Sequence, residues 1–226
     1  MLRNLLGASA TADTMLEAIA RDAQETGDKT GRPVFGDAVM DTMHTVPRAA
    51  FVPEAEKPFA YENRPLPIGH GQTISQPFVV ALMTELLDVE PGARILEVGT
   101  GCGYQTAILS ELGATVYSVE VVAPLATAAA ARLKALGYTQ ATVRAGDGHA
   151  GWPEEAPFDG IIVTAAAPSV PAALVDQLRP GGRLVIPVGP AGATQQLQRL
   201  ERRADGSCEA KTVLPVAFVP LTRGPA

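Results

Sequence analysis

The sequence predicts an α/β fold with a mostly parallel sheet, an antiparallel hairpin at its C-terminal edge and a helical cap at the N-terminus. Between residues 94 and 188, short β-prone runs alternate with helical patterns, which is typical of a parallel sheet. After residue 195, strand-like runs follow one another without a long helix between them. Two helical patterns come before this part of the chain. We therefore divide the chain into an N-terminal helical extension, residues 1–45, and a main domain, residues 46–226.

The N-terminal extension contains the two predicted helices of the cap. Apolar residues recur at helical spacing over residues 15–23, with Asp13 or Thr14 as candidate N-cap. Gly27 is expected to end this helix. A second short helix is expected over residues 37–46, because the proline that follows cannot continue it.

Residues 51–77 are rich in proline and glycine and read as one long irregular segment. Such a segment in a compact domain is functional or disordered. Its aromatic and aliphatic side chains, among them Phe51, Phe59 and Tyr61, are not typical of a disordered tail. We expect this segment to fold over a bound ligand.

In the main domain, predicted strands and helices then alternate regularly. Pro77 suits the first turn of a helix that runs to about residue 87. Strands are predicted over residues 94–98, 117–120, 141–145, 158–164 and 183–188, and helices over residues 105–112, 123–136 and 171–178. Three further strand-like runs, residues 195–203, 211–214 and 216–221, predict the terminal hairpin.

Composition restricts the possible partners. The chain has 226 residues, 46% of them apolar and 19% charged, and a net charge of −6. This balance indicates a globular protein and disfavours nucleic acid or an anionic membrane as a standing partner. Cys102 and Cys208 are too few for a disulfide framework or a zinc site, so no metal is expected. Because residues 1–10 lack the apolar run of a secretory signal, we expect a cytoplasmic protein. We also expect a monomer.

A glycine loop follows the strand at residues 94–98. Its glycines at positions 99, 101 and 103 allow a close approach of the backbone to a ligand. The spacing G-x-G-x-G is not that of a dinucleotide fold, and the Lys-Ser or Lys-Thr of a phosphate loop is absent. Glycines after a strand are often only a turn, and a Glu that ends a strand is often a solvated charge. Three strand ends that carry Gly99, Glu120 and Asp147 argue together for a ligand site.

With Glu97 before it, the loop resembles motif I of the S-adenosylmethionine-dependent class I methyltransferases, which have a Rossmann-like sheet. In these enzymes an acid at the end of the second strand binds the ribose hydroxyls, and residues after the third strand lie against the adenine. Glu120 and the segment 146–148 occupy these positions. The cofactor implied is S-adenosyl-L-methionine, with S-adenosyl-L-homocysteine as its product.

More specifically, the sequence resembles the protein-L-isoaspartate O-methyltransferases over residues 46–222. The motifs that carry the resemblance are VPRAAFVP at 46–53, GQTISQP at 71–77, GDG at 146–148 with GWP at 151–153, TAAAP at 164–168, PGGRL at 180–184 and VPLT at 219–222. Residues 1–45 match the family less well. The resemblance implies repair: the free carboxylate of an L-isoaspartyl residue in a damaged protein or peptide is methylated, and the ester closes to a succinimide.

The resemblance also implies roles for particular residues. Ser75 matches the active-site serine and is the candidate catalytic residue, within an active-site loop at residues 59–76 that is expected to close over the ligands. Thr73, Ser75 and Ala165 are expected to contact the substrate. The residues expected to bind the cofactor are Gln72, Thr73, Ile74, Ser75, Glu97, Gly99, Thr100, Gly101, Gly103, Glu120, Val121, Asp147, Gly148 and Thr222.

The residue types agree with methylation of a carboxylate. The three histidines, His44, His70 and His149, are far apart in the sequence, and no strong general base is evident. A carboxylate has a pKa near 4 and is already ionised at neutral pH, so it needs no base. The Ser75 hydroxyl can donate a hydrogen bond to it without removing a proton, although a serine before Pro77 can also serve only to cap a helix.

Two alternatives have the same glycine loop and ribose acid. The first is a class I methyltransferase that acts on a small molecule, another protein carboxylate or RNA. The second is an inactive cofactor-binding module, against which Thr73 and Ser75 argue. Methylation of an isoaspartyl peptide, compared with its aspartyl twin, separates these possibilities.

Overall fold

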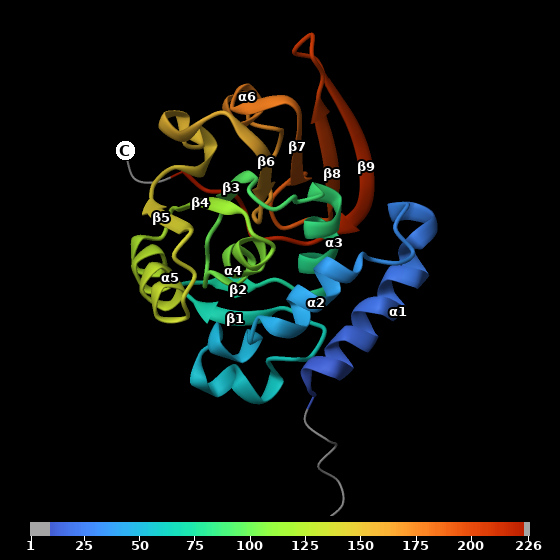
Figure 1. Ribbon diagram of the computed structural model, residues 1–226, viewed down its shortest axis with the longest axis vertical. Coiled ribbons are helices and arrows are strands. Elements are labelled where there is room, and N and C mark those ends of the chain that lie inside the picture. The colour runs from blue at the N-terminus through green and yellow to red at the C-terminus, as the bar shows by residue number, and fades with distance from the viewer. Residues whose placement is uncertain (1–9, 224–226) are drawn as a thin grey trace, which may run out of the picture.

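The computed structural model describes residues 10–223, so the outermost parts of both predicted domains, residues 1–9 and 224–226, lie outside the described residues. Its centre is a seven-stranded sheet with the order β5-β4-β3-β6-β7-β8-β9 (Figure 1). Strands β3 to β7 run parallel, and β8 and β9 are antiparallel to their neighbours. This confirms the predicted sheet. The strands are β3 Arg94–Val98, β4 Thr115–Glu120, β5 Ala141–Ala145, β6 Phe158–Val163, β7 Leu178–Val188, β8 Gln195–Arg202 and β9 Cys208–Val216.

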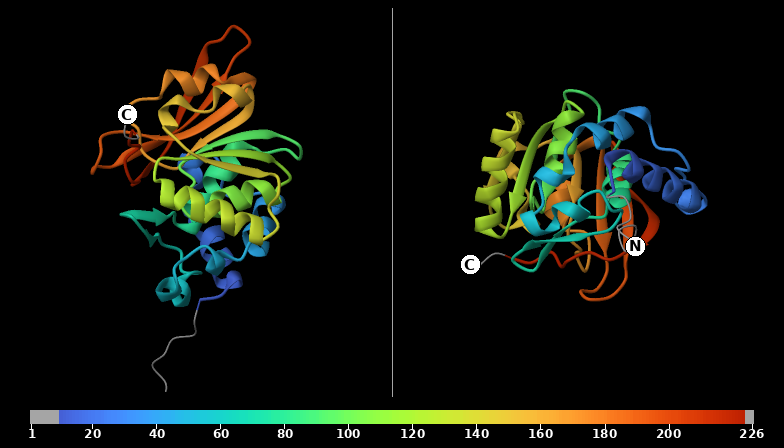
Figure 2. Two further views of the ribbon diagram at one scale, coloured as in Figure 1. Left: turned by 90° about the vertical axis from the view of Figure 1, so that its left-hand side faces the viewer. Right: turned by 90° about the horizontal axis from the view of Figure 1, so that it is seen from below.

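Two cores lie on the two faces of the sheet, because side chains alternate along each strand. Ile95 belongs to the core under α3, α4 and α5, whereas its neighbour Leu96 belongs to the core under α6. Figure 2 shows these layers from two further directions. Helix α6 is shorter than predicted because β7 already begins at Leu178. The four helices are α3 Pro77–Leu87, α4 Tyr104–Glu111, α5 Ala123–Ala135 and α6 Ala172–Asp176.

The N-terminal cap consists of α1, Ala12–Thr30, and α2, Asp37–Thr45, which both pack against α3. The predicted N-cap at Asp13 or Thr14 is wrong, because both residues lie in the first turn of α1; the N-cap is Thr11, which forms a capping box with Thr14. The predicted end at Gly27 is wrong, since the helix continues to a left-handed Gly31. Gly27 is a packing residue: a Cβ there would lie 2.6 Å from the Cβ of Pro33. The boundary between cap and main domain at residue 45 stays a prediction.

The segment 51–77 is more ordered than predicted. It contains a 3-10 helix, η2 Glu54–Phe59, and an antiparallel hairpin of β1, Leu66–Gly69, and β2, Gln72–Ile74. His70 has a positive φ of 54° in the turn between these strands. Strands of four and three residues give too short an alternation to be separated from loop by sequence pattern. The hairpin brings Thr73 and Ser75 to the site described below.

The C-terminal hairpin of β8 and β9 is confirmed, but the predicted strand at 216–221 is wrong. β9 ends at Val216, and the chain then crosses the carboxyl ends of the parallel strands. The N–H of Ala166 donates to the carbonyl of Val219 (2.8 Å), and the N–H of Leu221 donates to the carbonyl of Ala166 (2.7 Å). This crossing segment forms one wall of the candidate site.

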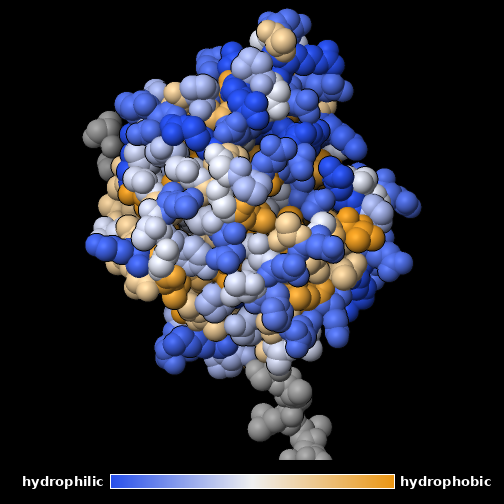
Figure 3. All heavy atoms as spheres, viewed as in Figure 1, coloured by the Kyte–Doolittle hydropathy of each residue, from blue (hydrophilic) through white to orange (hydrophobic). Residues whose placement is uncertain are grey.

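The visible surface carries apolar residues in small groups among polar ones (Figure 3). In the described part of the chain, the exposed large hydrophobic side chains are Val34, Phe59 and Leu136, which belong to three separate segments. Among residues 10–223, no helix is long and apolar enough to cross a membrane. Over the same range, no three His, Cys, Asp or Glu side chains are grouped so that they could hold a metal ion.

Candidate active site

The site lies where β3, β4 and β6 end side by side. Val98 on β3 pairs with Val119 on β4 and with Val163 on β6. The residues that follow therefore lie at one level: the glycine loop 99–103 after β3, Glu120 at the end of β4 and Thr164 after β6. Carboxyl ends of parallel strands are the usual ligand site of such sheets.

The glycine loop needs its glycines for two reasons. Gly99, Gly101 and Gly103 have φ values of 97°, 55° and 89°, which side chains disfavour. Gly99 is also in close contact with the end of β6, because a Cβ there would overlap the Thr164 hydroxyl. That hydroxyl donates to the carbonyl of Gly99 (2.6 Å). The loop is thus fixed to the neighbouring strand at its first residue.

Glu120 fixes the loop from the other side. Its Oε2 accepts the N–H of Gly101 (2.8 Å), and its Oε1 accepts the N–H of Val122 (2.9 Å). A carboxylate has about four acceptor positions, so each oxygen keeps one for a ligand. This arrangement fits an acid that accepts two neighbouring hydroxyls.

Glu97 lies beneath the loop and is completely buried. Its Oε2 accepts hydrogen bonds from the hydroxyls of Thr106 and Ser118. Because Ser118 gives its proton to Glu97, the Thr100 hydroxyl is the donor in its 2.5 Å contact with Ser118. Burial raises the pKa of Glu97 to about 7. In residues 10–223, Oε1 of Glu97 has no hydrogen-bond partner.

Two small cavities lie on either side of the glycine loop. The first, which we name the glycine-loop cavity, has a volume of about 50 Å³, and residues 219–222 of the crossing segment form part of its lining. It brings together nine of the predicted site residues: Gln72, Thr73, Gly99, Gly101, Glu120, Val121, Gly148, Ala165 and Thr222. The second cavity, of about 40 Å³, is lined by Ile74, Ser75 and Thr100, among others.

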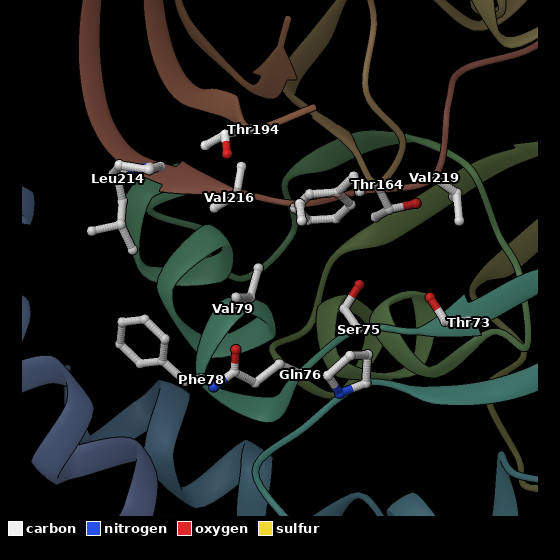
Figure 4. A pocket seen from close by; sticks show the side chains of 14 residues that line it. Thr73, Ser75, Gln76, Phe78, Val79, Thr164, Thr194, Leu214, Val216 and Val219 are labelled. Carbon is white, nitrogen blue, oxygen red and sulfur yellow. The ribbon is translucent and has the colours of Figure 1, made fainter. Parts of the chain in front are cut away.

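A larger opening, which we name the Ser75 groove, has a volume of about 440 Å³. It lies between the start of α3 and the end of β9 (Figure 4). Thr73 and Ser75 stand on one side and Thr164 on the other, and the hydroxyls of Thr73 and Ser75 are turned toward the space between them. Thr73 and Thr164 also line both small cavities, so the three spaces meet at these two residues. No histidine is among the described residues that line them.

Three of the predicted site residues line none of these spaces. Glu97 holds the hydroxyls beneath the loop, and Gly103 begins α4, where a Cβ would lie 3.3 Å from Leu133. Asp147 caps a short 3-10 helix by accepting the N–H of His149 (2.9 Å). These three residues shape the backbone around the site.

The structure adds residues that sequence reasoning did not select. Thr164 belongs to one of the quoted motifs and follows the fourth parallel strand, so the strand-end rule applied to Glu120 would have found it. Gln76 lines the Ser75 groove, and Arg48 contacts the backbone of Ser75. Gln76 directly follows Ser75, whereas nothing in the sequence pattern indicates the contact of Arg48.

Comparisons with known proteins agree with this geometry. Residues 27–226 match the family model described as Protein-L-isoaspartate(D-aspartate) O-methyltransferase. The chain is 55% identical over 210 residues to Protein-L-isoaspartate O-methyltransferase 2 of Syntrophobacter fumaroxidans, which covers 93% of this chain and 85% of that protein. It is 54% identical over 208 residues to the protein of the same name from a Polaromonas species, covering 92% and 99%.

A solved structure is similar over almost the whole fold. It is a Plasmodium falciparum chain described as a protein-L-isoaspartate O-methyltransferase in complex with S-adenosyl-L-homocysteine. Its TM-score to this chain is 0.79 at 27% identity, and the match covers 95% of this chain and 99% of that one. The chain described here belongs to the protein-L-isoaspartate(D-aspartate) O-methyltransferase family.

Proposed function

We propose that this protein transfers a methyl group from S-adenosyl-L-methionine to the free carboxylate of L-isoaspartyl residues in damaged proteins and peptides. Membership of the family and 55% identity to a relative of that name support the activity. The observation that carries the proposal is the meeting of three spaces at Thr73 and Thr164. A methyl donor beside the glycine loop and a carboxylate acceptor in the Ser75 groove would come together at these two residues.

The glycine-loop cavity fits the donor. Its backbone cradle depends on the absence of a Cβ at Gly99, and a Cβ at Gly148 would overlap Val98. The free acceptor positions of Glu120 suit the two ribose hydroxyls. We assign cofactor contacts to the residues that line the two small cavities, and a supporting role to Glu97, Gly103 and Asp147.

The acceptor side uses hydroxyl groups. We propose that Ser75 is the catalytic residue and donates a hydrogen bond to one carboxylate oxygen, which leaves the other oxygen facing the methyl group. Thr73 and Ala165 complete the substrate contacts. When bound, S-adenosyl-L-methionine supplies an electrophilic methyl carbon, whose bond to sulfur breaks as the carboxylate oxygen bonds to it. Since the carboxylate is already anionic, the protein contributes alignment rather than proton transfer.

We expect the walls of the glycine-loop cavity to move when the methyl donor enters. Ligand pockets usually measure about 300–1,000 Å³, whereas the glycine-loop cavity measures about 50 Å³. The β1–β2 hairpin and the crossing segment at 217–222 are the walls that can move outward. We expect added S-adenosyl-L-homocysteine to change the rate of limited proteolysis within residues 59–76, and an unchanged rate would contradict movement of this loop on binding.

The decisive experiment is methylation of a synthetic isoaspartyl peptide and of its aspartyl twin by the purified protein. We expect base-labile methyl incorporation into the first peptide and at most trace incorporation into the second. Equal incorporation into both, or incorporation into RNA instead, would exclude the proposed substrate.

We also propose that the protein works as a cytoplasmic monomer, without nucleic acid or membrane partners. The net charge of −6 supports the part that concerns anionic partners. Sedimentation equilibrium tests the monomer directly, and a concentration-independent dimer mass would contradict it.

A further inference from the structure

Two anchors hold the active-site loop, one from helix α1 and one from Arg48 in the 3-10 helix Arg48–Ala50, and the proposed mechanism uses neither of them. α1 lies largely outside residues 27–226, which the family model matches. It nevertheless packs against α3, the helix that begins two residues after Ser75. Its buried residues Met15, Ile19 and Ala23 fix its position there.

The first anchor is a relay from α1 to the start of α3. Asn63, inside the active-site loop, donates from Nδ2 to Asp22 Oδ2 on α1 (2.7 Å). The same amide accepts, through Oδ1, the N–H of Phe78 (3.0 Å). Phe78 lies in the first turn of α3, where backbone N–H groups have no partner within the helix. Asp22 therefore orients the side chain that caps α3 from outside.

The second anchor is Arg48, whose side chain is fully buried. Its Nε donates to the carbonyl of Ala60 (2.9 Å), and its Nη2 donates to the carbonyl of Ser75 (2.7 Å). The guanidinium also lies over the ring of Tyr104, 4.9 Å from its centre. Arg48 thus joins both ends of the active-site loop to the first residue after the glycine loop.

The electrostatics of Arg48 are unusual for a buried charge. In the described part of the chain no carboxylate forms an ion pair with it, and Nη1 has no hydrogen-bond partner. Burying an unpaired charge is costly. The two carbonyls and the Tyr104 ring offset part of this cost only if the backbone at residues 60 and 75 stays in place.

Together the anchors fix the backbone that directly follows the Ser75 side chain. The carbonyl of Ser75 is held by Arg48, and the N–H of Phe78, three residues later, is held by Asn63. We infer that Asp22, Asn63 and Arg48 are positioning residues that orient the hydroxyl of Ser75. This inference rests on the proposed function, since it assigns a role to residues around the same site.

The first test compares Asp22→Ala with Asp22→Asn, which keeps an oxygen that can accept from Asn63. Misplacing a reacting group by about 1 Å can cost about 100-fold, and the relay acts indirectly, so we expect kcat of Asp22→Ala to fall about 10-fold. KM for the donor and binding of S-adenosyl-L-homocysteine should stay within about twofold of wild type, while Asp22→Asn recovers kcat. Glu25→Ala, an exposed acid on the same helix, is the matched control.

The second test compares Arg48→Lys with Arg48→Met. Lysine keeps the charge but cannot bridge both carbonyls and cover the ring. We expect about 10-fold loss of kcat with lysine and about 100-fold with methionine. Amide hydrogen exchange at residues 59–78 should become faster in Arg48→Lys and Asp22→Ala than in wild type and Glu25→Ala. This readout keeps the test valid if Arg48→Met does not fold.

The outcomes separate this inference from the proposed function. If wild type methylates isoaspartyl peptides and Asp22→Ala keeps its kcat and its exchange rates, the inference is wrong. A uniform loss of kcat, donor binding and thermal stability would also contradict it, because that is the signature of a purely structural role. If wild type methylates no isoaspartyl peptide but exchange in the loop still accelerates in the variants, the anchoring stands and the proposed function fails.

Discussion

The glycine-loop cavity and the Ser75 groove are assembled from very different parts of the chain. Most supports of the glycine loop come from residues 97–122, which are two strands and the helix between them. The groove takes its walls from segments as far apart as Pro65, Thr164 and Val219. A buried polar network supports the first, whereas mostly apolar side chains from β9 and α3 line the second. Mutations at the glycine loop should therefore act by disturbing its close packing. Mutations in the groove should act by removing single polar contacts.

The largest effect is expected for Gly99→Ala. A Cβ would overlap the Thr164 hydroxyl at a backbone angle of 97° that alanine disfavours. Strain and overlap together cost roughly 4 kcal/mol in the wild-type loop geometry, so we expect the loop of the variant to relax away from it. Because the ligand must then restore that geometry, we expect affinity for S-adenosyl-L-homocysteine to fall by up to about 1,000-fold. Calorimetric titration measures this. Gly181→Ala has a similar φ of 78° but open space around it, so an equal loss there would show that overlap with Thr164 is irrelevant.

The next effect concerns Glu97 and the pH dependence of stability. Burial raises the pKa of Glu97 from its ordinary value of 4.5 to about 7, so folding favours the protonated form. The contribution of Glu97 is then fully present below about pH 4.5 and is lost as pH rises to about 7. A difference of roughly 2.5 pKa units corresponds to about 3 kcal/mol.

This difference is measured by denaturant unfolding of wild type and Glu97→Gln in the absence of S-adenosyl-L-methionine. We expect the free energy of unfolding of wild type to fall by about 3 kcal/mol relative to the variant between pH 4.5 and 7.5. Glu154→Gln, which removes an exposed carboxylate, should show no such trend. If the free energies of unfolding of wild type and Glu97→Gln change in parallel with pH, the pKa of the Glu97 carboxylate is not raised.

On the groove side, Ser75→Ala should act more strongly on turnover than on binding of the methyl donor, although Ser75 also lines the second small cavity. A hydrogen bond to a charged group is worth about 1.5–3 kcal/mol, so we expect kcat to fall about 30-fold. Affinity for S-adenosyl-L-homocysteine should change less than threefold. Ser207→Ala in the distant β8–β9 turn serves as control. Full turnover by Ser75→Ala would remove this residue from the mechanism.

The smallest effect is expected for Gln76→Ala. Among the described residues, the Gln76 amide lines the groove without a hydrogen bond to another side chain or backbone group, and it lies beside Ser75 (Figure 4). It is free to bind the peptide backbone, and a neutral hydrogen bond is worth about 1 kcal/mol. We expect KM for an isoaspartyl peptide to rise about fivefold with kcat unchanged. Gln140→Ala, on the exposed surface, is the control, and an unchanged KM would leave Gln76 without a substrate contact.

The sequence by itself determined the fold class and predicted which residues come together in the glycine-loop half of the candidate site. Alternating strands and helices predict a parallel sheet, and a parallel sheet brings the ends of β3 and β4 together, so Gly99 and Glu120 could be placed from spacing alone. The elements that the sequence did not predict correctly were short or had an ambiguous pattern. The β1–β2 hairpin has too few residues for a pattern, and the run at 216–221 has β-prone residues but lies across strand ends where it has no continuous partner.

Only the tertiary structure decided the Ser75 groove and its supports. The contacts from Arg48 to Ser75 and from Asp22 to Asn63 join residues 27 and 41 positions apart, which no local periodicity can reveal. Periodicity reports which face of an element is buried, not which distant element covers it. Sequence motifs could indicate Ser75 as a candidate, but the chain must fold before its hydroxyl meets Thr73 and Thr164 across one space.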